Sequence, residues 1–213
     1  PGQWGAVGAA VAAVVLISVV PLAALVERSL RVGPGWSFDN WQGLGSVTEG
    51  TGLRVSPWDA VMVSLGTSLA ATALAMALAL PAVRVVAHRP GGTADRVLLL
   101  PLGVSSTTIG LGLLLAAGRP PLDLRGSWWL VPVAQALVAL PLVVRAILPA
   151  LRSIPDSVLD GAALLGVAPA QRWWRVELPL VRRSVAAGAG LALVACLGEF
   201  GATVFLARSG RPT

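Results

Sequence analysis

Residues 160–179 read DGAALLGVAPAQRWWRVELP, a polar stretch with the pattern of helix that lies between two apolar segments. Residues 161–163 are Gly-Ala-Ala and give a surface with almost no side-chain bulk, followed by an apolar edge of two leucines. Gly166 suits the left-handed conformation that ends many helices, and Pro169 suits the first turn of the next helix. The stretch therefore predicts two short helices joined at a glycine, with the second ending before Pro179.

The segments on either side of this stretch are long and apolar. Hydrophobic residues make up 55% of the 213 residues and charged residues 12%, which is too few charges to cover a soluble protein of this size. A membrane-spanning helix needs roughly 20 mostly apolar residues. We therefore expect an all-α polytopic membrane protein, with one transmembrane domain over residues 1–213 and a cytoplasmic loop at 152–183. The predicted spans are 5–26, 60–83, 97–117, 128–151 and 184–207.

The arginines give a weak preference for one orientation. With the N-terminus inside, nine arginines fall in inside segments and seven in outside segments, in the direction that the positive-inside rule favours. Tryptophans at 36, 41, 58, 128 and 129 then lie at or near the outer interface, where an indole ring finds both lipid and water. This orientation places the loop at 152–183 on the cytoplasmic side.

The composition argues against several kinds of chemistry. There is one cysteine, Cys196, and one histidine, His88, which argues against a disulfide framework and against a His/Cys metal cluster. The chain has no lysine and no Gly-x-x-x-x-Gly-Lys-Ser/Thr loop, so we expect ATP hydrolysis to come from another subunit. No arginine stripe interleaved with aromatic residues indicates a nucleic-acid groove. We expect no cofactor to be bound by this chain.

A few polar residues lie inside the predicted spans. Glu199 is the one acid well inside a span, and an ionisable residue there is by default a candidate functional group. Ser105, Ser106, Thr107 and Thr108 form the other polar cluster within a span. These residues would line a cargo route or a gate. The alternatives are an acid that pairs with an arginine or reaches the outer interface, and hydroxyls that bond back to helix carbonyls.

Residues 160–179 resemble the cytoplasmic motif of type I ABC importer permeases, which reads Glu-Ala-Ala, three residues, Gly, nine residues, Ile, one residue, Leu-Pro. All spacings match, and the three departures (Asp for Glu, Gly for the first Ala, Val for Ile) are chemically mild. The matching residues are Asp160, Gly161 and Ala162, then Gly166, and then Val176, Leu178 and Pro179. The resemblance covers a long motif in a loop between spans of the right number.

This resemblance implies that the loop forms coupling helices, which dock into a groove of an ATPase subunit. It implies two further partners besides the ATPase pair and the lipid bilayer of a bacterial plasma membrane: a second permease half, fused or separate, and an extracytoplasmic substrate-binding protein. The ATPase-coupling residues would be Asp160, Gly161, Ala162, Ala163, Gly166, Arg172, Arg175, Leu178 and Pro179. For Arg172 and Arg175 the alternative is that they are solvated flanks.

Shorter runs resemble the branch of this family that handles ferric iron and thiamine. They are LPLGVS at 100–105, ALPLVVR at 139–145 and LGEFGAT at 197–203. By this resemblance the chain, which starts at Pro1 and stops at Thr213, would be a fragment of the C-terminal half with its sixth span missing. The alternatives are a permease for molybdate, sulfate or polyamine. From other classes they are a membrane assembly protein or an intramembrane enzyme, for which no span supplies a second catalytic group.

Overall fold

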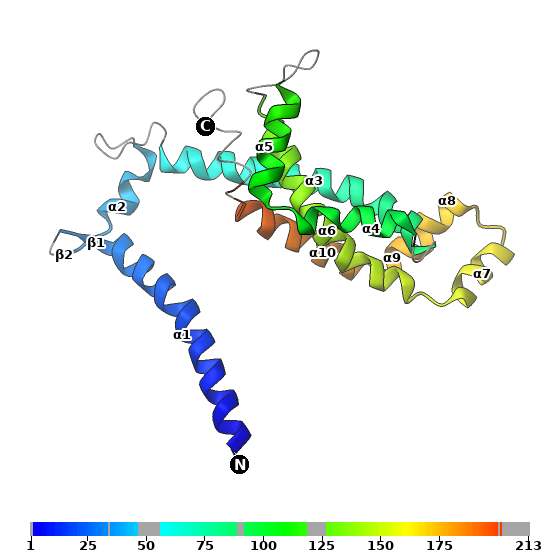
Figure 1. The fold of residues 1–213 in the computed structure, drawn as a ribbon, viewed down its shortest axis with the longest axis horizontal. Helices are drawn as coiled ribbons and strands as arrows, with labels where there is room; N and C mark the ends of the chain where they lie inside the picture. The colour runs from blue at the N-terminus through cyan, green and yellow to red at the C-terminus, as the bar shows by residue number, and fades with distance from the viewer. Residues whose placement is uncertain are drawn as a thin grey trace. The chain divides into compact units, whose positions relative to one another are not determined.

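The computed structural model describes residues 2–33, 35–46, 56–88, 92–118, 127–199 and 201. Nearly all of these residues are helical, so the all-α prediction is confirmed (Figure 1). The chain divides into two compact units, Pro1–Val61 and Met62–Thr213, which are described separately below.

The first unit consists of one long helix followed by a small turn structure. Helix α1 (Gly2–Leu30) contains the predicted span 5–26, and its residues Val7–Leu30 are long and apolar enough to cross a membrane. Strands β1 (Arg31–Val32) and β2 (Gly35–Trp36) pair antiparallel, and α2 (Asp39–Gln42) and the 3-10 turn η1 (Gly43–Gly45) follow. The Asn40 side-chain amide donates to the carbonyls of Ser29 and Arg31, at 3.1 and 3.2 Å, and holds α2 against the end of α1.

The second unit contains two uninterrupted spans, α3 (Pro57–Ala87) and α6 (Leu130–Arg152). They correspond to the predicted spans 60–83 and 128–151. Together with α1 they make three helices in the described part of the chain that are long and apolar enough to cross a membrane. The number rises to five if each of two sharply bent helix pairs is one span.

The predicted span 97–117 is not one continuous helix but a sharply bent helix pair. It divides into α4 (Thr93–Leu99), the 3-10 turn η2 (Leu100–Gly103) and α5 (Ser106–Ala117), with a bend of 104°. Pro101 has no N–H to continue the helix, and the backbone of Val104 and Ser105 is extended, with ψ of 135° and 137°. Because of this break, the axes of α4 and α5 point in different directions.

The described helix at the predicted span 184–207 covers its first part. Helix α10 (Arg182–Leu197) ends at the Gly198 cap, and the predicted residues 202–207 lie outside the described part of the chain. At its other end α10 is bent by 75° from the helical segment Pro169–Leu180 that precedes it.

The core of the second unit lies where α3, α6 and α10 pack together. Ala71, Ala75 and Ala79 of α3 are fully buried, and small residues at such contacts let helix backbones approach closely. A Cβ on Gly188 of α10 would lie 3.4 Å from the Cβ of Ala146 on α6, so these two helices are also in close contact.

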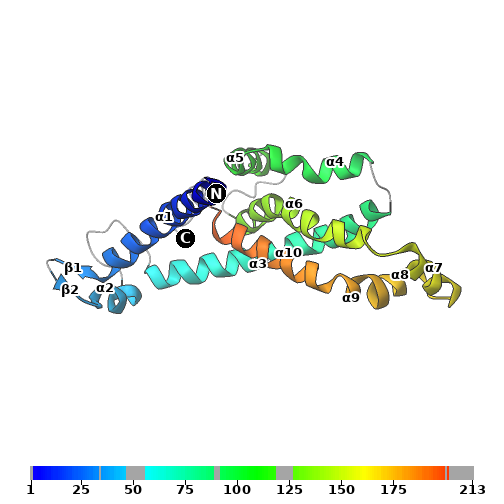
Figure 2. The same cartoon turned by 90° about the horizontal axis from the view of Figure 1, so that it is seen from below.

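One end of this unit carries the loop 152–183. It contains α7 (Asp156–Leu164), α8 (Pro169–Arg172), the π-helical turn η3 (Trp173–Glu177) and α9 (Leu178–Leu180). Both views show α7 as the outermost element, beyond the ends of α6 and α3 (Figures 1 and 2). Because the C-terminal ends of α3 and α6 and the start of α10 lie at this end, three helices meet beneath the loop.

Candidate functional site

The turn between α7 and α8 has the geometry that the sequence predicts. Gly166 has a φ of +74°, the N–H of Gly166 bonds to the Ala163 carbonyl at 2.9 Å, and the N–H of Val167 bonds to the Ala162 carbonyl at 3.1 Å. These two bonds define a Schellman motif, which ends a helix with a left-handed residue. A Cβ on Gly166 would meet nothing within 4 Å. Glycine is therefore favoured here by backbone conformation and not by lack of space.

The predicted small-residue ridge is only partly exposed. Asp160 and Ala163 face outward, Gly161 is half-buried, and Ala162 is 8% exposed and faces the interior. Leu164 and Leu165, which follow the ridge, are 89% and 84% exposed, more than any other large hydrophobic side chain in the described residues. Two apolar side chains this exposed, at the tip of a loop, are typical of a contact surface for another protein.

The second helical segment begins as expected but ends later. Pro169 occupies the start of α8, as predicted. The prediction that the helix ends before Pro179 was wrong, because α9 runs through Pro179 to Leu180 and the bend follows at Val181. The N–H of Leu178 bonds to the Trp173 carbonyl in the wide π turn, and such a turn relieves the constraint that a proline places on an α-helix.

The two arginines of the loop differ in their surroundings. The Arg172 Nε lies 3.0 Å from the Glu177 Oε1, and the Glu177 side chain is 1% exposed, so this ion pair is largely buried. Arg175 is exposed. Glu177 was not among the predicted site residues, although it is an acid at the one unspecified position between Val176 and Leu178.

A second contact that the sequence analysis missed joins the loop to α3. The Arg84 Nη2 donates to the Pro169 carbonyl at 2.5 Å, and the Arg84 guanidinium carbon lies 5.4 Å from the centre of the Trp173 ring. Trp173 is 6% exposed. No local pattern could predict this contact, because the residues are 85 positions apart.

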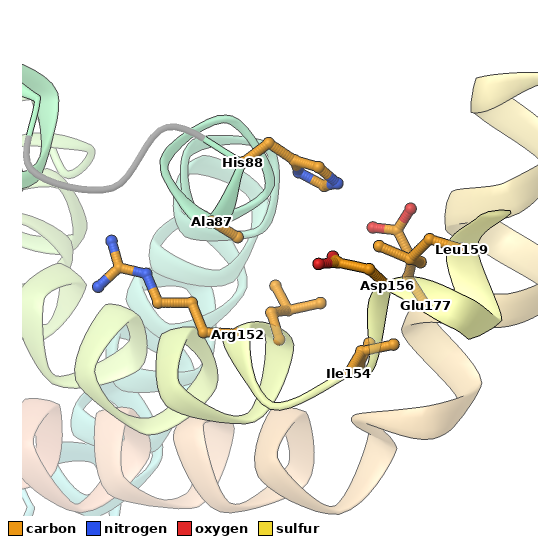
Figure 3. Close-up of a pocket in the computed structure, with 8 residues that line it drawn as sticks. Ala87, His88, Arg152, Ile154, Asp156, Leu159 and Glu177 are labelled. Atoms are coloured by element: carbon orange, nitrogen blue, oxygen red, sulfur yellow. The ribbon is translucent and has the colours of Figure 1, made fainter.

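A cavity of about 430 Å³ lies under the loop. Figure 3 shows the His88 imidazole, at the end of α3, facing Asp156 and Glu177 across this cavity. The Arg152 guanidinium turns toward α3, where it donates to the Val86 carbonyl at 3.4 Å. The remaining lining residues are Ala87, Leu151, Ile154 and Leu159. Among the described residues, no group of three or more His, Cys, Asp or Glu side chains is placed to hold a metal ion.

The polar residues that the sequence places inside spans come together at Gly201. A Cβ on Gly201 would lie 2.7 Å from the Ser106 Oγ, 2.9 Å from the Thr107 Oγ1 and 3.2 Å from the Glu199 Oε1. These three oxygens, called the polar cluster below, therefore converge on Gly201, where any side chain would displace at least two of them. Ser105, which caps α5 without a side-chain hydrogen bond, and Thr108 are exposed beside it.

Comparison with known proteins gives the family but does not support the expected branch. The model of the family described as binding-protein-dependent transport system inner membrane component matches residues 71–211. The molybdenum transport system permease protein ModB of Mycobacterium tuberculosis is 35% identical over 163 residues, covering 70% of this chain and 62% of that protein. The sulfate transport system permease protein CysT of Escherichia coli is 28% identical over 220 residues, covering 97% and 76%.

A third relative is also named as a transport system permease protein. The putative 2-aminoethylphosphonate transport system permease protein PhnV of Salmonella typhimurium is 28% identical over 164 residues, covering 76% of this chain and 62% of that protein. The chain thus spans somewhat less than two thirds of the length of the first relatives. These names support the importer-permease resemblance but not its ferric iron and thiamine branch. The match over residues 71–211, together with the apolar helices, shows that this chain belongs to the binding-protein-dependent transport system inner membrane components, as a multi-pass protein of the plasma membrane.

Proposed function

We propose that the chain is the translocation subunit of an ATP-driven importer and does not hydrolyse ATP itself. It would work with an ATPase pair, a second permease half and an extracytoplasmic binding protein. The observation that carries this proposal is the shape of the loop 152–183. Its Gly166 turn projects Leu164 and Leu165 beyond the place where three helices meet. A force applied to this tip would reach the spans directly.

The cargo in this proposal is a small tetrahedral oxyanion, with molybdate first and sulfate second. Support comes from the names of the relatives, which refer to molybdenum, sulfate and 2-aminoethylphosphonate, since molybdate, sulfate and a phosphonate all carry a negatively charged tetrahedral group. The chain itself has a formal net charge of +6, which favours anions over cations near its surface. The oxyanion replaces ferric iron and thiamine as our expected cargo.

The polar cluster is the proposed constriction of the route. Ser106 and Thr107 bring hydroxyl groups to the N-terminal end of α5, where free backbone N–H groups favour a negative charge. The Glu199 carboxylate beside them opposes an anion at the same point. In this proposal the arrangement is a closed state, and Glu199 has to move away from Ser106 before an oxyanion passes.

Uptake by the reconstituted transporter tests the cargo. The full chain would be assembled in proteoliposomes with its ATPase and binding protein, and uptake of labelled molybdate, sulfate, 2-aminoethylphosphonate, ferric iron and thiamine would be compared with and without ATP. We expect ATP-dependent uptake of an oxyanion and none of iron or thiamine. Uptake of iron or thiamine alone would refute the cargo assignment, and the absence of any ATP-dependent uptake would refute the importer function.

A further inference from the structure

Arg84 makes two contacts with the same short segment of the loop. Its Nη2 donates to the Pro169 carbonyl, and its guanidinium lies over the Trp173 ring. The backbone N–H of Trp173 also bonds to the Pro169 carbonyl. One arginine of α3 therefore contacts both the carbonyl that begins α8 and the ring that follows its last residue.

This pair of contacts depends on the shape of a guanidinium group. Arginine is planar and stays charged, so it stacks on an aromatic face and donates hydrogen bonds from its edge at the same time. A lysine ammonium at position 84 could keep the charge but not this combined geometry. Trp173 is 6% exposed and Arg84 is half-buried, and reduced contact with water strengthens both interactions.

The segment that Arg84 contacts is internally stiffened. The buried ion pair between Arg172 and Glu177 lies within the nine residues of α8 and η3 and joins α8 to the π turn. Leu164 and Leu165, by contrast, project outward from the preceding helix. The loop therefore has a projecting tip and a braced segment, and Arg84 connects the braced segment to α3.

We propose that Arg84 is a positioning residue for energy coupling, which ties α8 to α3 so that movement of the loop reaches α3 as well as α6 and α10. The last two helices are joined to the loop by the chain itself, whereas α3 contacts the loop through side chains, and Arg84 is the residue that joins it to α8. The inference rests on the proposed function of the loop. Without the contact, the ATPase still binds the tip, but part of the movement is lost before it reaches α3.

The test compares Arg84→Gln and Arg84→Lys with Arg96→Gln in the intact transporter. Arg96 is an exposed arginine on α4 and serves as the matched control for loss of one charge. We expect the Arg84→Gln transporter to retain its ATPase and to hydrolyse ATP. The amount of cargo transported per ATP should fall about tenfold, because the variant loses a charge-assisted hydrogen bond and a stacking contact. Arg84→Lys should recover only part of the loss, and Arg96→Gln should match the wild type.

Two further measurements keep the test decisive if Arg84→Gln lowers the yield of the complex. Trp173→Leu removes the stacked ring, and the double variant with Arg84→Gln should lose less coupling than the sum of the two single variants, because both remove the stacking contact. Spin labels at Val85 and Gln171 should give a narrow distance distribution through the ATP cycle in the wild type and a broad one in Arg84→Gln. A wild-type ratio of cargo to ATP in Arg84→Gln, or additive losses in the double variant, would overturn the inference. Failure of the wild type itself to transport would instead count against the proposed function.

Discussion

Replacing Gly166 gives the sharpest test of the loop geometry. At φ +74° a residue with a Cβ is strained, and a left-handed conformation costs an L-residue roughly 1–2 kcal/mol. The cost is higher for a β-branched residue such as valine. Since a Cβ at this position would meet nothing within 4 Å, the whole penalty comes from the backbone. Gly166→Val should therefore reduce the population of the native turn by about 5- to 30-fold.

The assay is binding of the ATPase subunit to the purified permease, followed by cargo uptake. We expect Gly166→Val to weaken ATPase binding by about the same 5- to 30-fold, because only the native turn presents Leu164 and Leu165 together. Gly166→Asn is the matched control, since asparagine is similar in size to valine but tolerates the left-handed region. If valine and asparagine weakened binding equally, bulk at the interface would explain the loss, and the reasoning from backbone strain would be refuted.

Three further substitutions test other parts of the structure. Gly201→Ala should abolish uptake without loss of the ATPase, because its Cβ would lie under 3.0 Å from two hydroxyls of the polar cluster. Gly190→Ala is the control and should leave uptake unchanged, because its Cβ would meet nothing within 4 Å. Glu177→Leu should destabilise the loop by about 1.5–3 kcal/mol, measured by hydrogen exchange, because it leaves Arg172 without its buried partner. Gly188→Leu should lower thermal stability in detergent by about 1–3 kcal/mol through overpacking between α10 and α6, and an unchanged melting temperature would contradict that contact.

The parts of the fold that could be predicted from sequence depend on local chemistry. Glycine is favoured where the backbone is left-handed, and proline is favoured in the first turn of a helix. The local sequence around Gly166 and Pro169 was therefore enough to locate the turn and the start of α8. The spans α3 and α6 follow from their length and their lack of charge. The sequence predicted Leu164 and Leu165 as an apolar edge beside small residues, whereas the high exposure of both side chains is seen only in the structure.

The parts that could not be predicted depend on contacts between distant residues or on breaks inside apolar runs. The bend before α5 lies in a segment as apolar as a continuous span. Pro101 indicated a break in the helix there, but the high hydropathy of the segment favoured one continuous span. The contact between Arg84 and Trp173 leaves no local pattern, because arginines at helix ends are common in membrane proteins. Pro179 indicated a helix end, but the π turn that precedes it is not encoded by any recognisable spacing.

The loop and the polar cluster lie at opposite ends of one helix. Helix α10 has 16 residues, which is about 24 Å at 1.5 Å per residue, and it begins at the bend that follows the loop and ends just before Glu199. It is pressed against α6 at Gly188, and close-packed helices move together and do not deform smoothly. A displacement of the loop would therefore be carried along α10 to Glu199. Ser106 and Thr107 lie at the start of α5, after the 104° bend, and α5 packs against Leu130 and Ala134 of α6 through its last turns, so these hydroxyls are not carried on α10 itself. The distance between Glu199 and these hydroxyls is thus the quantity that we expect to change most when the loop moves.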